Sequence, residues 1–445
     1  MKDNVSQKVI KVRATVPPEA TVAKLKDYID AGFNTIYMTE DYNSGLGKEE
    51  YLNHLKLCQE MGLEIIIYSY DYFNIPGRYE YSGTDNCYLD LINFDLKEFP
   101  KIKGFFAWDE PNFKQYDELY KKLGTRYNEK YKNEYSWEVN LLPSYAAPGQ
   151  QLGIVGDANE TAYEKYIKGY FEKVHSKIEG DNIKVSLDHY PFRRLNGKNL
   201  ISSTWLYDLA LVSREAKKYV GDFGCCIQCY DDGVMRGSQS HADIGIQVYS
   251  SMVFGVKFFE MYHYISIPGS CGIAESDGKL NEGYYHVQKV LKDIHSFEHI
   301  YLDFDWQGFT TVNGQNKEIV NECFKPLEKY ELKNLLGVES AAASEDALIG
   351  HFVNKQGCNA YMIANFADPV DGETNVVELN LQNQTKVIIY MNGQELYKNV
   401  IDGKLILKLE KGMGAFVVLC DNKKIKNKRL NFTRRKNGRR ETNKK

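Results

Sequence analysis

Eight short apolar segments alternate with longer amphipathic segments between Val9 and about Ile265. Each apolar segment has five to eight residues, rich in β-branched and aromatic types, which is typical of strands buried on both faces. Eight such alternations predict an α/β fold, in which parallel strands close into a (β/α)8 TIM barrel. A doubly wound open sheet usually has fewer strands, and no Gly-rich phosphate loop follows the first segment. The predicted strands are Val9–Val16, Phe33–Met38, Leu63–Tyr70, Ile102–Trp108, Ser136–Leu142, Ile183–Leu187, Phe223–Cys229 and Val256–Tyr262.

From about residue 300 the pattern changes to short runs of alternating apolar and polar residues. Turn dipeptides such as Asn392-Gly393 and Asp402-Gly403 separate these runs, as in antiparallel sheets. The sequence therefore predicts a barrel over residues 8–299, a small C-terminal β-sandwich over residues 300–420 and a tail over residues 421–445. Six sandwich strands are expected: Ala347–Asn354, Cys358–Phe366, Asn375–Leu381, Lys386–Met391, Lys404–Leu409 and Gly414–Leu419.

Charge is distributed unevenly along the chain. Residues 421–445 hold twelve Lys and Arg against two acidic residues, a net charge of +10, and the remaining 420 residues carry −14. Because this basic tail lacks apolar periodicity, we expect it to be disordered. It could act as an arm for nucleic acid or an anionic surface, or simply as a solvated extension. We favour the extension and expect no nucleic-acid partner, since nothing else in the chain resembles a nucleic-acid-binding module.

The nine cysteines are scattered, and the N-terminus has no apolar stretch of the signal-peptide type. No run approaches the roughly 18 apolar residues that a transmembrane helix needs. These features favour a cytoplasmic protein with reduced thiols and no membrane association. Cys225, Cys226 and Cys229 are expected to be buried strand residues, because no second Cys or His pair lies at zinc distance. No metal or other cofactor is implied.

Carboxylates, amides and aromatic residues occur at the C-terminal ends of the predicted strands. In a (β/α)8 barrel these ends converge on one pocket, although they lie far apart in the sequence. Glycoside hydrolysis needs one protonated carboxyl for the leaving oxygen, a second carboxylate for the anomeric carbon or its water, and groups that bind the ring. The strand ends supply Glu40, Asp71, Trp108-Asp109-Glu110, Asn140, Asp188-His189-Tyr190, Gln228 with Asp231-Asp232 beyond it, and Glu260-Met261-Tyr262.

The fourth predicted strand ends abruptly in two carboxylates and a proline, in the stretch Gly104–Asn112. Barrel enzymes keep their chemistry at such strand ends, so Glu110 is the first candidate for a catalytic acid. The other interpretation is that Asp109 and Glu110 cap a helix that begins at Pro111.

Four segments carry a resemblance to a known family: Gly104–Pro111, Val139–Pro143, Ser186–Phe192 and Ile246–Tyr249 running into Phe254–Glu260. With these segments the chain resembles clan A glycoside hydrolases, particularly the β-galactosidase-like enzymes of family 42. With the C-terminal β-domain, the similarity spans about residues 8–420. In that clan an Asn-Glu pair ends the fourth strand and the Glu is the acid/base. The resemblance therefore assigns this role to Glu110, with Asp109 in the Asn position.

The nucleophile of that clan is a Glu at the end of the seventh strand, where this chain has Gln228. An amide cannot serve as a carboxylate nucleophile. Either the second carboxylate comes from elsewhere, or the site binds sugar without cleaving it. We favour Glu260, since a carboxyl inside an apolar strand is costly to bury unless it is functional or paired. Its alternative role is a structural ion pair with Arg13. The other candidates for the second carboxylate are Asp188, Asp231 and Asp232.

The leading hypothesis is therefore a glycoside hydrolase that acts on a small oligosaccharide or glycoside, with Glu110 as general acid/base and Glu260 as its partner. The alternative is a non-catalytic carbohydrate-binding barrel that has lost its nucleophile. His189 and His263 are expected to be hydrogen-bonded groups rather than metal ligands. Substrate contacts are expected from the aromatic residues Trp108, Tyr190 and Tyr262 and from the polar residues Asp109, Asn140, Asp188 and Gln228.

Overall fold

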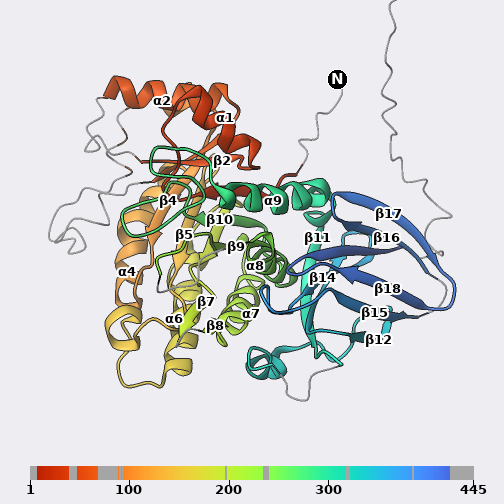
Figure 1. Cartoon of the computed structure of the whole chain (residues 1–445). Helices are drawn as coiled ribbons and strands as arrows, with labels where there is room; N and C mark the ends of the chain where they lie inside the picture. The colour runs from red at the N-terminus through yellow and green to blue at the C-terminus, as the bar shows by residue number, and fades with distance from the viewer. Residues whose placement is uncertain are drawn as a thin grey trace, which may run out of the picture.

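A computed structural model describes residues 8–39, 48–68, 89, 92, 94–195, 198–233, 240–315, 321–382 and 385–420. A parallel barrel forms the N-terminal part and an antiparallel β-sandwich lies beside it (Figure 1). This architecture confirms the predicted TIM barrel with a C-terminal β-sandwich. Glu40, Asp71 and the basic tail lie outside the described residues, so the expectations for them stay predictions.

Eight parallel strands form the barrel wall in the order β1-β10-β9-β6-β5-β4-β3-β2. The wall closes between β1 and β2, where the Asn34 N–H donates to the Val12 carbonyl at 3.1 Å. A short antiparallel hairpin, β7 (Phe192–Leu195) with β8 (Lys198–Ile201), follows β6. The wall strands are β1 (Lys11–Ala14), β2 (Thr35–Thr39), β3 (Glu64–Tyr68), β4 (Ile102–Asp109), β5 (Ser136–Leu141), β6 (Ile183–Leu187), β9 (Asp222–Gln228) and β10 (Phe258–Tyr262).

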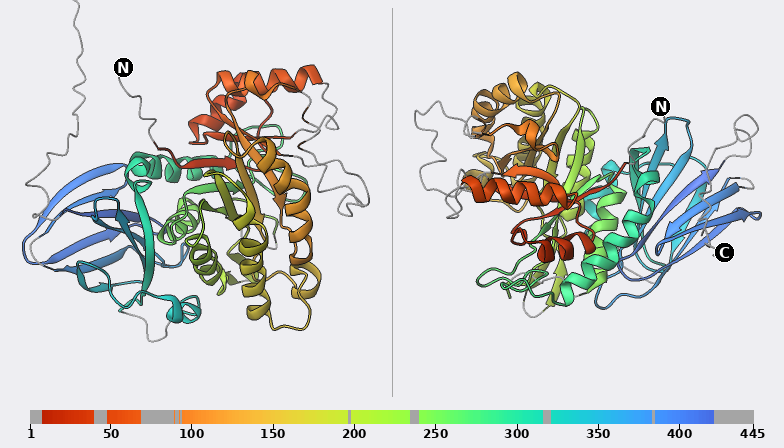
Figure 2. Two further views of the ribbon diagram at one scale, coloured as in Figure 1. Left: turned by 180° about the vertical axis from the view of Figure 1, so that it is seen from behind. Right: turned by 90° about the horizontal axis from the view of Figure 1, so that it is seen from above.

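Helices cover the outside of the barrel (Figure 2). The stretch between β4 and β5 divides into short 3-10, α, π and α segments. None of the described helices is long and apolar enough to cross a membrane. The α-helices are α1 (Val22–Asp30), α2 (Lys48–Glu60), α4 (Tyr116–Leu119), α5 (Thr125–Lys130), α6 (Asn159–Lys173), α7 (Trp205–Ala216), α8 (His241–Val253) and α9 (Glu282–Tyr301).

Two antiparallel sheets form the sandwich, one in the order β11-β13-β14-β19-β16-β17 and one in the order β12-β15-β18. The cluster that fills the space between them is mostly Val, Leu and Ile. Asn392 and Gly393 both have positive φ and make the turn between β16 and β17, as this dipeptide predicts. The strands are β11 (Phe304–Val312), β12 (Val338–Ala343), β13 (Ala347–Asn354), β14 (Asn359–Asn365), β15 (Asn375–Leu381), β16 (Thr385–Met391), β17 (Gln394–Val400), β18 (Lys404–Leu409) and β19 (Gly414–Cys420).

The barrel and the sandwich meet along α8 and α9 (Figures 1 and 2). Every residue of α8 after His241 is buried, because the helix packs on β9 and also on β13 and β14. The Trp306 indole N–H donates to the Val253 carbonyl at 2.9 Å across this seam. Phe297 of α9 stacks on Phe416 of β19 with ring centroids 6.1 Å apart. A single hydrophobic core therefore runs from the barrel helices into the sandwich.

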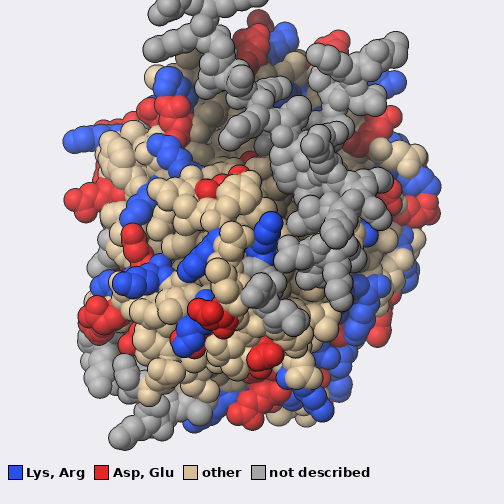
Figure 3. Space-filling model, turned by 90° about the vertical axis from the view of Figure 1, so that its right-hand side faces the viewer, with Lys and Arg blue, Asp and Glu red and all other residues tan. Residues whose placement is uncertain are grey.

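The surface at the sandwich side carries both signs of charge. Figure 3 looks at the molecule from this side, and the Lys and Arg side chains are interspersed with Asp and Glu. On the described part of this face there is no extended area of one sign. The face therefore lacks the basic stripe that is typical of surfaces that bind nucleic acid.

Candidate active site

A β-bulge decides which side chains of β4 face the barrel interior. Phe106 pairs with Glu138, but a register shift follows, so that Asp109 rather than Trp108 comes opposite Asn140. Asp109 therefore points inward. Trp108 packs among the residues of the helix layer and is 2% exposed. The ring expected to stack on a sugar lies on the helix side of the barrel wall.

Glu110 leaves β4 with a left-handed backbone, at φ 50°. Its N–H donates to the Asn140 carbonyl at 2.9 Å, which holds this conformation. The side chain is partly exposed at the barrel mouth. The helix-capping role considered for Asp109 and Glu110 belongs to Asn112, whose side chain accepts the Lys114 N–H at 3.0 Å. Asp109 and Glu110 therefore do not cap the helical segment that follows β4.

One amide joins the carboxylates at the ends of β4 and β6. Asn140 Nδ2 donates to Asp109 Oδ1 and to Asp188 Oδ2, each at 3.1 Å. Asn140 Oδ1 accepts the Ser186 hydroxyl at 2.9 Å, which fixes the orientation of the amide. The two carboxylate oxygens are therefore no further apart than twice 3.1 Å. Retaining glycosidases hold their carboxyl pair about 5–5.5 Å apart, and inverting enzymes hold theirs about 6.5–9.5 Å apart.

Burial and mutual repulsion raise the pKa of three carboxyls at this mouth. Burial, followed by the charges of Asp188 and Asp109, raises the pKa of Glu110. Burial with the charges of Asp188 and Glu260 raises the pKa of Asp109. Burial also raises the pKa of Asp188, but a hydrogen bond from Tyr190 opposes the rise. The rise is largest at Glu110 and smallest at Asp188, so Glu110 is the last of the three to lose its proton as the pH increases.

Glu260 lies deeper inside the barrel and is 3% exposed. Its Oε2 accepts hydrogen bonds from Arg13 Nε at 3.2 Å and from the Tyr37 hydroxyl. Arg13 also pairs with Glu138, which in turn pairs with Lys184 at 2.7 Å. The ion pair with Arg13, the alternative role for Glu260, is therefore present. Its catalytic role stays a prediction.

This buried network balances its charges. Burial alone would raise the pKa of Glu138, but the charges of Arg13 and Lys184 lower it to about 2. Burial raises the pKa of Glu260, and Arg13 and the Tyr37 hydroxyl oppose that rise. Sequence reasoning missed Glu138, Lys184 and Tyr37 as parts of the network. The available signal was a charged residue inside β5, two positions before Asn140 and therefore on the same face of the strand.

Three tyrosines form an aromatic cluster at the strand ends. The ring centroids of Tyr190, Tyr230 and Tyr262 lie 5.2 to 5.4 Å apart. Tyr190 and Tyr262 are partly exposed, which leaves ring surface for a ligand. Gln228, at the end of β9, is fully buried, and its Oε1 accepts the Phe192 N–H at 2.9 Å. Its amide therefore fixes the start of β7.

The two acidic residues beyond β9 lie in the segment that follows this strand. Asp231 forms an ion pair with Arg194 at 3.6 Å, and Asp232 is exposed. Neither is among the charges that raise the pKa of Asp109, Glu110 or Asp188. Asp188, by contrast, shares the Asn140 amide with Asp109.

The histidines and cysteines of the barrel are used in packing and hydrogen bonding. His189 and His263 each have hydrogen-bond partners at both ring nitrogens, as predicted. Cys225, Cys226 and Cys229 are buried, also as predicted. Within the part of the chain that the structure describes, no three His, Cys, Asp or Glu side chains are arranged to hold a metal ion.

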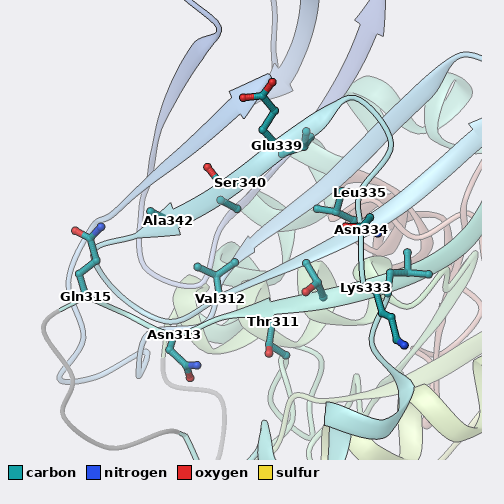
Figure 4. Close-up of a pocket in the computed structure, with 14 residues that line it drawn as sticks. Thr311, Val312, Asn313, Gln315, Lys333, Asn334, Leu335, Glu339, Ser340 and Ala342 are labelled. Atoms are coloured by element: carbon teal, nitrogen blue, oxygen red, sulfur yellow. The ribbon is translucent and has the colours of Figure 1, made fainter. Parts of the chain in front are cut away.

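A hollow of about 490 Å³ lies in the sandwich, between β11, β12 and the segment that precedes β12 (Figure 4). Thr311, Asn313 and Lys333 are among the residues that line it. Glu339 is the one carboxylate of the described lining, and in Figure 4 it points away from Thr311 and Asn313. The hollow lacks the carboxyl pair that two-carboxylate hydrolysis needs.

No family model and no curated protein matches this chain. Among solved structures, it resembles a candidate α-galactosidase from Bacteroides fragilis, with 13% identity and a TM-score of 0.54 over 93% of this chain and 79% of the other. A candidate α-galactosidase/melibiase from the same organism has 11% identity and a TM-score of 0.50 over the same shares. At this identity the likeness concerns the fold alone. The resemblance to family 42 stays a prediction.

Proposed function

We propose that this chain is a glycoside hydrolase that cleaves the O-glycosidic bond of a small oligosaccharide or glycoside with two carboxyl groups at the barrel mouth. The observation that carries the proposal is the Asn140 amide, which holds Asp109 and Asp188 together beside Glu110. The proposed pair, Glu110 and Asp188, lies close enough for the charge of Asp188 to raise the pKa of Glu110. The partly exposed Tyr190 and Tyr262 suit a sugar.

In this mechanism Glu110 is the general acid, because its raised pKa keeps the proton that the leaving oxygen needs. Asp188 is the nucleophile, because it is the first of the three carboxyls to become charged. Asp188 attacks the anomeric carbon while the leaving oxygen takes the proton of Glu110. Water, deprotonated by Glu110, then displaces the sugar from Asp188. Asp109 holds a substrate hydroxyl, and Asn140 keeps Asp188 in place.

Glu260 is the competing candidate for the second carboxylate. It is buried, and Arg13 and Tyr37 bind its Oε2, whereas Asp188 is partly exposed. These contacts favour Asp188. For the substrate, the family 42 resemblance favours β-galactosides, and the names of the structural neighbours favour α-galactosides.

Turnover of aryl and alkyl galactosides of both anomers tests the proposal. We expect Glu110→Gln to slow cleavage of an alkyl glycoside by about 10²- to 10⁴-fold, and that of an activated aryl glycoside much less, because an activated leaving group needs no proton. Asp188→Asn should slow both alike, since a nucleophile is needed whatever departs. Glu339→Gln, in the sandwich hollow, is the matched control and should leave both rates unchanged.

The same assay decides between the candidates. Glu260→Gln with full activity would eliminate Glu260 as the partner, and Asp188→Asn with full activity would eliminate Asp188. A wild-type chain that binds galactose but cleaves none of these glycosides would favour the non-catalytic carbohydrate-binding barrel. The sequence argument for that alternative is Gln228, which stands where the clan has its nucleophilic Glu.

A further inference from the structure

A second set of reactive side chains lies between the end of β6 and the start of α7. His189 Nδ1 lies 2.6 Å from Asp208 Oδ2, and His189 Nε2 lies 3.0 Å from Ser202 Oγ. The Asp208 carboxylate accepts the proton of Nδ1, so Nε2 is the acceptor of the Ser202 hydroxyl. This is the connection of acid, imidazole and hydroxyl that activates a serine nucleophile. The proposed glycosidase mechanism uses none of the three residues.

Of these three residues, the serine is more exposed than the acid and the imidazole, as a nucleophile requires. Asp208 is 0% exposed and His189 is 1% exposed, whereas Ser202 is partly exposed. Asp208 Oδ2 also accepts the Ser144 N–H at 2.8 Å, which fixes the carboxylate from a second side. The edge of the Tyr145 ring packs against His189 with centroids 4.9 Å apart. The imidazole is therefore held in one orientation while the hydroxyl stays within reach of a ligand.

Space for a small group lies beside the two residues that precede Ser202. A hollow of about 240 Å³ is lined by Ile201, the preceding residue, and by Cys323, whose thiol donates to the Ser202 carbonyl at 3.7 Å. Leu200 and Phe366 give the hollow apolar surface, and Glu322 and Asp368 also line it. Sites for drug-sized ligands are larger, about 300–1,000 Å³, so this hollow suits a short acyl chain.

The Ser202 backbone is bound to the start of α7, whose first turn also carries Asp208. The helix begins at Trp205, three residues after Ser202, and the Trp205 N–H donates back to the Ser202 carbonyl at 3.2 Å. N–H groups in the first turn of a helix have no partner within the helix, and the dipole concentrates positive charge there. Such donors stabilise the negative oxygen that forms when a serine attacks a carbonyl group.

We propose that Ser202, His189 and Asp208 form a second catalytic site, which hydrolyses esters of short-chain carboxylic acids. Ser202 Oγ attacks the ester carbonyl carbon while its proton passes to His189 Nε2. The bond between that carbon and the alcohol oxygen breaks, and the alcohol leaves with this proton. Water then attacks the acyl-serine and gives a proton to His189. The bond to Ser202 Oγ breaks, the carboxylic acid leaves and Ser202 recovers the proton.

Labelling with a fluorophosphonate and hydrolysis of p-nitrophenyl acetate by the full chain test this proposal. We expect mass spectrometry to find the label on Ser202. Ser202→Ala should abolish the label and slow hydrolysis by about 10³-fold or more. Asp208→Asn should slow hydrolysis by about 10⁴-fold, because the amide favours the wrong imidazole tautomer. Ser203→Ala, at the exposed neighbouring serine, is the matched control and should behave as the wild type.

A folded wild-type chain that leaves Ser202 unlabelled overturns the proposal, and so does a Ser202→Ala variant that hydrolyses the ester at the wild-type rate. The labelling result does not depend on the folding of any variant. Galactoside cleavage is measured in parallel on the same samples. Ser202 has no part in that reaction, so failure of the glycosidase proposal and failure of this one appear in different assays.

Discussion

The interiors of the barrel and the sandwich are equally buried but differ in their chemistry. Inside the barrel, Arg13, Glu138 and Glu260 are at most 3% exposed. Between the sandwich sheets, aliphatic residues such as Ile363 and Leu407 are buried to the same degree. Burying an aliphatic side chain stabilises a fold by about 25 cal/mol per Å², whereas a buried charge costs free energy unless it is well paired. The charged interior therefore marks the barrel as the region shaped by a requirement other than stability.

Removing the Arg13 charge from the barrel interior should have the largest effect on stability. Arg13→Met leaves Glu138 and Glu260 without their shared cation, so we expect the free energy of unfolding to fall by about 3–5 kcal/mol. Urea denaturation measures this change. Lys165→Met, which removes an exposed ion pair with Asp157, is the control and should change the value little. A small loss in Arg13→Met would mean that water or rearrangement satisfies the two carboxylates.

Truncation in the sandwich core should cost stability but not activity. Leu407 on β18 is 3% exposed, so Leu407→Ala should lower the free energy of unfolding by about 2–5 kcal/mol through lost burial and a cavity. The rate of glycoside cleavage per folded molecule should stay at the wild-type value, because no sandwich residue belongs to the proposed site. A lower rate in fully folded Leu407→Ala would contradict this separation of roles.

The raised pKa of Asp109 makes stability depend on pH. A carboxyl with a higher pKa in the folded state stabilises the fold when protonated, and this contribution is lost as the pH rises through the folded pKa. We therefore expect the stabilising contribution of Asp109 to be lost as the pH rises from about 4 to about 7, and Asp109→Asn to flatten the pH dependence in this range by about 1 kcal/mol or more. Denaturation curves for the two proteins at several pH values provide the measurement. Parallel pH profiles would show that Asp109 does not titrate as described.

Removing the basic tail should have the smallest effect. Residues 423–445 lack apolar periodicity. Their deletion should therefore leave the melting temperature and any sugar binding unchanged. Thermal denaturation and a sugar-binding measurement check this expectation. A drop of several degrees would show that the tail contributes to one of the two regions.

Most of the fold could be predicted because its buried strands carry clear apolar patterns. Ala347–Asn354, Asn375–Leu381 and Lys404–Leu409 begin and end where their patterns predict. β17 was missed because it is an edge strand, exposed at every position but the last, so no buried face constrains its sequence. β11 was missed because Gly308, at a bulge with positive φ, interrupts its pattern.

The residues of the candidate site that lie at the ends of strands could be predicted from the sequence. Asp109, Asn140 and Asp188 meet because parallel strands bring their C-terminal ends together. The inward turn of Asp109 in place of Trp108 could not be predicted, because it depends on a one-residue register shift. The relay from Ser202 to Asp208 was also missed, since a loop residue and a helix residue meet His189 through tertiary packing that follows no spacing rule.

The burial of α8 has a consequence for how this protein can be engineered and how it can evolve. Regions that share few contacts can be exchanged between genes as independent modules. From Ala242 to Val253, however, α8 has no side that faces water. Removing the sandwich would leave an apolar helix face in solvent and favour aggregation. A barrel without its sandwich would therefore need a redesigned α8, and recombination is expected to transmit the two regions together.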